Sequence, residues 1–310
     1  MINKYFKLVN HRDFVLLLAI VTGMVLGQRS AFLGDISVWV LAGVMVFSTI
    51  GFSFSDWRPF KNAFSHIYKA LFLNYFIFGG SIMLLTLLLP KGEDYELIRT
   101  GLIIIAAAPA GPSIVAFTTL LKGNVTFSLN GVFGITLAAV GITPLLIYLF
   151  LGSTGVSPWL LIPMLLKLIV LPVILSRILR HKRILPTAKQ IQGTVVKWGF
   201  FLVIVPTIGL SRDVIFSEPV LVLIVALILL VVIYGLSFGY YLLMKKNKTP
   251  EDIVSGVLLM VIKSSAFSAV IALNFFDQAI VALPSAVLSI FVTTFYITFS
   301  LFSNRFLVKV

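Results

Sequence analysis

One lysine lies in the middle of an apolar stretch, where its charge could bind an anion or replace a cation. Lys263 stands in VLLMVIKSSAFSAVIAL, and the nearest acidic residues, Asp252 and Asp277, flank this stretch. A charge at the centre of a bilayer costs about 2.5–3.5 kcal/mol even on scales from insertion experiments. Because apolar residues continue on both sides, the side chain cannot reach an interface. We therefore expect Lys263 to face a protein-lined site.

Three roles for Lys263 are open. Its ammonium could occupy the place of a bound cation, it could pair directly with an anionic ligand, or it could bind and release a proton. Ser264 and Ser265 follow it directly and are candidates to bind the same ligand. Lys167, inside another apolar stretch, could be a charge in a polar cavity or could pack against helix carbonyls; we favour packing.

The composition is that of a membrane protein built from many helices. Of 310 residues, 59% are hydrophobic and only 11% are charged, and the apolar runs are long enough to span a bilayer. The formal charge of +13 does not indicate nucleic-acid binding, because the basic residues cluster between apolar runs. With no cysteine, disulfides and thiolate metal sites are excluded, and we expect no cofactor and no metal.

The apolar runs predict an all-α fold with ten spans, including an uncleaved first one. The predicted spans are residues 14–30, 36–54, 68–89, 98–121, 126–150, 158–180, 194–210, 217–244, 252–274 and 279–303.

The distribution of lysine and arginine predicts that both termini are cytoplasmic. Eighteen of the 24 basic residues fall on the side of the N-terminus, and Lys167 and Lys263 lie within spans. Only four fall on the other side: Arg29, Lys91, Arg99 and Arg212. The three histidines, His11, His66 and His181, are expected in cytoplasmic loops.

All eleven acidic residues lie in predicted loops or at span edges. Sodium- and proton-coupled carriers commonly place a carboxylate deep in the membrane, so this distribution argues against such coupling. An intramembrane enzyme would need paired aspartates, a Ser–His pair or a histidine-rich metal site. The sequence shows none of these patterns, and we predict a protein that is not an enzyme.

The fourth span should break into two half-helices. Pro109, Gly111 and Pro112 fall in its middle, where proline removes a backbone donor and clashes with the preceding turn. Pro112 suits the first position of the second half-helix. The start of that half-helix, with Ser113, would then point N–H groups into the protein, where they could bind an anion.

Spans four and nine occupy equivalent places in the two five-span halves, residues 1–152 and 153–310, and cross the membrane in opposite directions. Two interrupted helices in such positions are typical of inverted-repeat secondary transporters, whose substrate binds where the helices cross. Span nine has no Gly or Pro at its centre, so its break would depend on Lys263, Ser264 and Ser265. We predict one transporter domain over residues 1–310.

The stretch PAGPSIVAFTTLLKGNVTFSL resembles the P-G-G-x-x-S-N-x-x-x-x-L-x-x-G-N-x-x-L-S pattern of the bile acid:sodium symporter family. The segments VMVFSTIGFSFSDW, LLKLIVLPVILSRILRHK and ALPSAVLSIF are similar to other parts of that family. The resemblance implies ten helices, with a core domain around two crossed helices and a panel domain beside it. It also implies alternating access and inward transport of organic anions with sodium. The matched positions are Pro109, Gly111, Leu120, Gly123, Asn124 and Ser128.

At the positions of the family's sodium ligands this chain differs. Ile114 and Val115 stand where the family has Ser-Asn, and Val132 where it has threonine. In the E-x-G-x-Q-N-S motif of span nine, Leu259 replaces the glutamate and Lys263 the glutamine. Of the family's oxygen donors, the resemblance leaves Ser128 as an ion-site candidate and Asn74 as a candidate for the ion or the substrate.

Together these features predict a secondary transporter of a small organic anion in the lipid of the bacterial inner membrane, with Lys263 replacing a bound cation. Sodium is disfavoured as a coupling ion, whereas coupling to a proton is an open possibility. The alternatives are a sodium- or proton-coupled bile-acid-type symporter, and a membrane protein that binds a ligand without transporting it.

Overall fold

The computed structural model describes residues 12–50, 60–111, 113–152, 158–276 and 278–306. Across these residues the secondary structure is helical, apart from one isolated β-bridge between Ala110 and Lys263. The elements are α2 (Arg12–Leu26), η1 (Gly27–Ser30), α3 (Ala31–Ser48), α4 (Phe60–Leu71), η3 (Phe72–Gly79), α5 (Gly80–Thr86), α6 (Glu93–Ala107), α7 (Ile114–Leu120), α8 (Val125–Leu151), α9 (Pro158–Leu165), η5 (Leu166–Val170), α10 (Leu171–Leu179), α11 (Leu185–Ser217), α12 (Pro219–Leu230), η6 (Val231–Gly235), α13 (Leu236–Met244), α14 (Pro250–Val261), α15 (Ser265–Phe275) and α16 (Ala279–Phe306).

Within the described part of the chain, seven continuous helical stretches are long and apolar enough to cross a membrane. The stretch Phe14–Ser48 contains the first predicted span and most of the second, with Gly27 (φ 54°) at the start of η1 between α2 and α3. Spans four and nine are not among the seven, because each consists of two shorter helices. The prediction of an all-helical membrane protein is confirmed, and the number of ten crossings stays a prediction.

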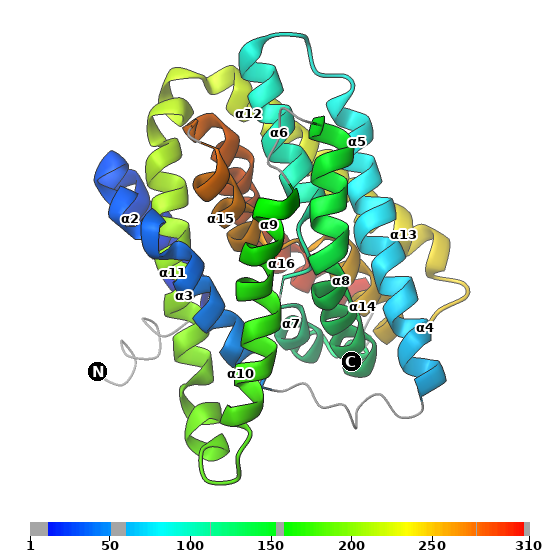
Figure 1. The fold of residues 1–310 in the computed structure, drawn as a ribbon. Coiled ribbons are helices and arrows are strands. Elements are labelled where there is room, and N and C mark those ends of the chain that lie inside the picture. The colour runs from blue at the N-terminus through cyan, green and yellow to red at the C-terminus, as the bar shows by residue number, and fades with distance from the viewer. Residues whose placement is uncertain (1–11, 51–59, 112, 153–157, 277, 307–310) are drawn as a thin grey trace, which may run out of the picture.

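The helices form two groups around the interrupted segments. On one side, the long helix α11 packs against both α2 and α3 (Figure 1). On the other side, α4, η3 and α5 form one continuous helical run that packs against α6, α8 and α14. The interrupted pairs α6/α7 and α14/α15 lie between these groups, where the largest cluster of buried apolar side chains is found. The fold therefore places the two interruptions at its centre.

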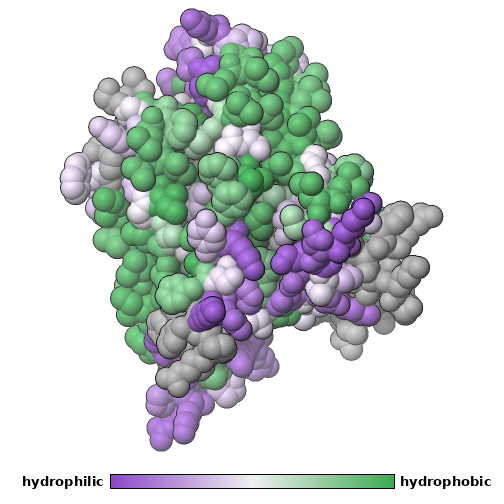
Figure 2. Space-filling view, turned by 90° about the vertical axis from the view of Figure 1, so that its right-hand side faces the viewer, coloured by the Kyte–Doolittle hydropathy of each residue, from purple (hydrophilic) through white to green (hydrophobic). Residues whose placement is uncertain are grey.

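The surface supports a membrane location. In Figure 2, apolar residues form a broad band, with hydrophilic residues gathered above and below it. Many large apolar side chains in this protein are exposed, including Leu84, Leu88 and Leu243. Such a band is what lipid tails require of a protein surface.

The predicted break in span four is present, and proline explains where it begins. α6 ends at Ala107, and the next residue, Ala108, is extended with ψ of 149°. A residue that precedes proline is driven out of the helical region, and Pro109 has no N–H to continue the helix. The second half, α7, begins at Ile114. Pro112, predicted at the start of this half, lies outside the described residues.

Span nine is also broken, although neither Gly nor Pro lies at the break. α14 ends at Val261, Ile262 and Ser264 are extended, and α15 begins at Ser265. The Ser264 side chain accepts a hydrogen bond from the N–H of Phe267 and so caps α15. Serine is among the preferred residues at this position. The local signal for the break is therefore a helix cap.

Two polar residues lie elsewhere than predicted. His66 is not in a loop: it lies on α4, half-buried, with its ring 5.2 Å from that of Phe127 and Nδ1 3.4 Å from Nδ2 of Asn130. Lys167 is exposed in η5, with Nζ 5.6 Å from the centre of the Trp39 ring. It contacts an aromatic face rather than helix carbonyls. His66 is on a helix because α4 begins at Phe60, before the predicted start of the third span.

Candidate functional site

The two interrupted segments cross through their backbones. The N–H of Gly111 donates to the carbonyl of Ile262 at 3.1 Å, and the N–H of Ser264 donates to the carbonyl of Pro109 at 2.9 Å. These reciprocal bonds enclose the pair of Ala110 and Lys263. They satisfy backbone groups that the helix ends leave free, as buried backbone polar groups require.

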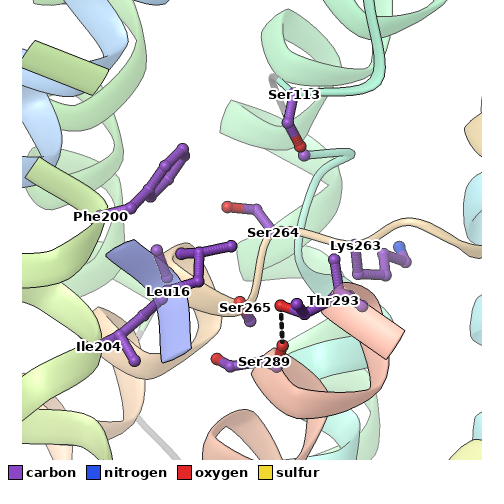
Figure 3. Close-up of a pocket in the computed structure, with 12 residues that line it drawn as sticks. Leu16, Ser113, Phe200, Ile204, Lys263, Ser264, Ser265, Ser289 and Thr293 are labelled. Atoms are coloured by element: carbon purple, nitrogen blue, oxygen red, sulfur yellow. Dashed lines mark hydrogen bonds between the residues drawn. The ribbon is translucent and has the colours of Figure 1, made fainter. Parts of the chain in front are cut away.

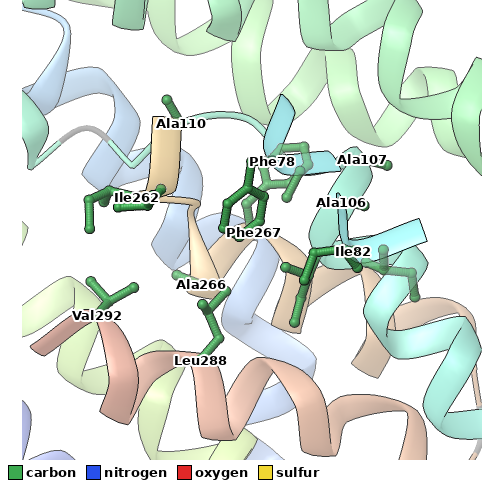
Figure 4. Packing of buried hydrophobic residues seen from close by; sticks show 14 of the residues in the cluster. Phe78, Ile82, Ala106, Ala107, Ala110, Ile262, Ala266, Phe267, Leu288 and Val292 are labelled. Atoms are coloured by element: carbon green, nitrogen blue, oxygen red, sulfur yellow. The ribbon is translucent and has the colours of Figure 1, made fainter. Parts of the chain in front are cut away.

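The residues at the crossing are small, which lets the segments approach closely. Ala106, Ala107 and Ala110 are buried there beside Phe78 and Phe267 (Figure 4). Gly111 fits for the same reason: a Cβ on it would lie 3.3 Å from Cγ2 of Ile262. A side chain at 111 would therefore press on Ile262, which would have to shift by a few tenths of an ångström.

The Lys263 ammonium is buried in a set of three oxygen acceptors. Its side chain is 1% exposed, and Nζ donates to Oδ1 of Asn74 at 2.7 Å, to the carbonyl of Ala106 at 2.9 Å and to the carbonyl of Ala108 at 2.7 Å. The Ala106 carbonyl is free because α6 ends one residue later. The break in span four thus supplies acceptors for the lysine of span nine.

The three acceptors suit a charged amine. An ammonium has three N–H donors, whereas a neutral amine has two donors and a lone pair that would face an acceptor. The amide orientation of Asn74 is set independently, because its Nδ2 donates to the carbonyl of Leu259 at 3.0 Å. Reversing the amide would place a donor against Lys263 and an oxygen against a carbonyl. The three acceptors therefore match Lys263 in its protonated form.

The surroundings stabilise positive charge without a carboxylate. Within the described residues, the three acceptors of the ammonium are uncharged. Two of them lie at the C-terminal end of α6, where the helix dipole is negative. Nζ also lies 4.5 Å from the ring centre of Tyr75 and 5.6 Å from that of Phe78, distances typical of cation–π contacts. The site has the properties of a cation-binding site that holds an ammonium.

A small cavity lies on the other side of the crossing. Its volume is about 40 Å³, much less than the roughly 300–1,000 Å³ of ligand pockets. The crossing contributes Ser113, Ser264 and Ser265, together with Gly111 and part of Lys263. Leu16 of α2 and Phe200 and Ile204 of α11 form the opposite wall. In Figure 3 the Lys263 amine points away from these residues. The cavity therefore lies between the crossing and the helices α2 and α11, and the ammonium does not face it.

The structure divides the predicted site residues into two groups. Lys263 and Asn74 meet on one side of the crossing, and Ser113, Ser264 and Ser265 line the cavity on the other. Ser128 belongs to neither group, because its hydroxyl bonds with that of Thr118 at 2.7 Å.

Three polar residues of α16 were not predicted. Ser289 and Thr293 line the cavity, and the hydroxyl of Tyr296 lies 3.1 Å from that of Ser113. Ser285, Ser289 and Thr293 recur every four residues in an apolar span, which places them on one face of a helix. That spacing is the signal from which this face could have been found.

Replacing Ser264 with alanine should destabilise the protein by about 1 kcal/mol, because α15 loses its capping side chain. Thermal unfolding in detergent measures this change. Ser264→Thr retains a capping hydroxyl and should stay close to the wild type. Equal loss in both variants would contradict the capping role.

One comparison with known proteins identifies the family of this chain. No curated protein matches the chain. Residues 38–218 match the model of the family described as "Sodium Bile acid symporter family". The match covers more than half of the chain and includes the whole of the first interruption. The chain therefore belongs to the sodium bile acid symporter family, and the family implies a membrane transporter of the bile acid symporter type.

Proposed function

We propose that this protein is a secondary transporter that carries a small organic anion by alternating access without two-sodium coupling. The Lys263 ammonium replaces a diffusible cation. The observation that supports this most directly is the set of three short hydrogen bonds from Nζ to Asn74, Ala106 and Ala108. In transporters with broken helices, unwound carbonyls and half-helix C-termini are the groups that coordinate the coupling cation.

The substrate side of the proposal depends on the cavity. Five hydroxyl-bearing residues line it: Ser113, Ser264, Ser265, Ser289 and Thr293. The N-terminus of α15 is also there, and the first N–H groups of a helix favour an anion. Hydroxyls together with a helix N-terminus suit a carboxylate, such as one resembling a bile acid or a keto acid. Pro112, the remaining predicted substrate residue, stays a prediction.

Transport requires this cavity to open. At about 40 Å³ it is well below the roughly 300–1,000 Å³ of pockets that hold small organic ligands. Separation of α2 and α11 from the crossing would enlarge it, since Leu16, Phe200 and Ile204 form that wall. We therefore assign α2, α3 and α11 to the moving panel.

We further propose that residues 1–152 and 153–310 form an inverted repeat with both termini in the cytoplasm. The pairs α6/α7 and α14/α15 support this arrangement, because each half contributes one interrupted span and the two interruptions bond reciprocally. The basic residues support the orientation.

A screen of carboxylates by thermal shift tests the binding half of the proposal, and flux into proteoliposomes tests the transport half. We expect at least one carboxylate, from a panel with taurocholate and 2-keto acids, to stabilise the protein in choline buffer as well as in sodium buffer. The same compound should then enter proteoliposomes. Stabilisation without flux would identify a ligand-binding protein that does not transport.

An imposed pH gradient tests the remaining coupling scheme. Because all three N–H groups of the ammonium are used, we expect initial uptake rates at fixed internal pH to be unchanged by a proton gradient. A rate that follows the gradient would support proton loading at Lys263 and contradict its role as a fixed cation.

A further inference from the structure

A second, larger cavity lies away from the crossing, between α4, α8, α13 and α14. Its volume is about 260 Å³. The polar part of its lining includes His66 and Lys69 of α4, Lys248 after α13, and Asp252 of α14. The two lysines are exposed, and they belong to the side that the positive-inside rule assigns to the cytoplasm.

The one acidic side chain in this lining has a partner. Oδ1 of Asp252 accepts a hydrogen bond from Nδ2 of Asn124 at 2.8 Å, in the loop that precedes α8. The carboxylate therefore ties α14 to that loop. The lining contains two lysines and only this one carboxylate. Two further lysines, Lys245 and Lys246, follow α13 directly. The mouth of the cavity thus favours an anion.

The apolar part of the lining continues onto the outer surface. Tyr68, Phe72 and Phe76 are four residues apart along the continuous run of α4 and η3 and are 71%, 43% and 68% exposed. The rings of Phe72 and Phe76 stack with centres 5.0 Å apart. An exposed aromatic row on one face of a membrane-spanning helix is a surface for an acyl chain.

We propose that this cavity binds the phosphate headgroup of an acidic phospholipid, with its acyl chains along Tyr68, Phe72 and Phe76. Basic pockets between membrane helices on the cytoplasmic side are suited to such headgroups. A soluble phosphate shares the headgroup chemistry, but it has no acyl chain that could contact the aromatic row. The row therefore favours the lipid as the source of the phosphate. This site is independent of the proposed role of Lys263.

Native mass spectrometry of the full-length protein tests the proposal. With equal amounts of phosphatidylglycerol and phosphatidylcholine in the micelle, we expect the wild type to retain phosphatidylglycerol preferentially. Lys69→Gln/Lys248→Gln should weaken that retention by roughly tenfold or more, since each basic residue near the surface adds to the attraction. Equal retention of the two lipids by the wild type would overturn the proposal.

A matched double variant controls for net charge. Lys182→Gln/Lys189→Gln removes two exposed lysines from the segment around the start of α11 and should keep the preference; a loss equal to that of the cavity variant would also overturn the proposal. A titration with inorganic phosphate distinguishes a lipid headgroup from a soluble phosphate as the ligand. If phosphate alone stabilises the lipid-free wild type but not the cavity variant, while the lipids are retained equally, the site binds soluble phosphate and the lipid assignment is wrong.

Discussion

Replacing Lys263 with methionine is expected to lower uptake by roughly 100-fold or more, since three buried acceptors lose their donor at about 1–3 kcal/mol each. Methionine fills a similar volume but donates no hydrogen bond. The carbonyls of Ala106 and Ala108 and the Oδ1 atom of Asn74 would then face one another without a positive charge between them. Initial uptake rates in proteoliposomes, normalised to reconstituted protein, measure the loss.

Two further variants show whether the loss comes from the position and the charge of Lys263. Lys167→Met removes the other lysine of an apolar span, but this side chain is exposed over Trp39, so uptake should stay near the wild-type rate. Lys263→Gln restores an N–H donor without the charge, and it should be inactive in choline but recover in part when sodium is added. Unchanged transport in Lys263→Gln would contradict a central role for the ammonium.

Replacing Asn74 with leucine is expected to destabilise the protein by about 2–4 kcal/mol, because two buried hydrogen bonds are broken at once. Asn74 accepts from Lys263 and donates to the carbonyl of Leu259. Asn74, which lies in η3, therefore links the C-terminal end of α14 to the Lys263 ammonium. Chemical or thermal unfolding in detergent measures the stability, and uptake should fall as well.

The control and the decisive comparison use the same assay. Asn62→Leu makes the same change at an exposed position of α4 and should change the stability by less than about 0.5 kcal/mol. The double variant Asn74→Leu/Lys263→Met should be less destabilised than the sum of the single variants, by about 0.5–3 kcal/mol. Additive effects would show that the two side chains act separately and would contradict the site described above.

The break in span four could be predicted from local chemistry. For span nine the sequence indicated the position of a break but not its cause. Pro109 forces Ala108 into an extended conformation whatever surrounds it. Ile262 has no such constraint: it is extended because its carbonyl bonds to Gly111, a residue more than a hundred positions away. Tertiary pairing of this kind leaves no mark in the local sequence except the capping residue Ser264.

The same distinction applies to the candidate site. The position of Lys263 in an apolar stretch indicates a protein-lined environment, and the structure buries the residue completely. Which side of the crossing the amine faces depends on where α6 ends and on Asn74 in η3. The cavity wall formed by Leu16, Phe200 and Ile204 depends on the packing of α2 and α11. Ordinary apolar residues of this kind carry no signal that singles them out in a sequence.

The most direct test of the central claim is the initial rate of uptake in sodium and in choline buffers of equal ionic strength. It uses the wild-type protein in proteoliposomes and a carboxylate identified by thermal shift. If the Lys263 ammonium replaces the coupling cation, the two rates will be equal and no ²²Na⁺ will enter with the substrate. Uptake that requires sodium, with ²²Na⁺ accumulating in proportion to the anion, would contradict the account.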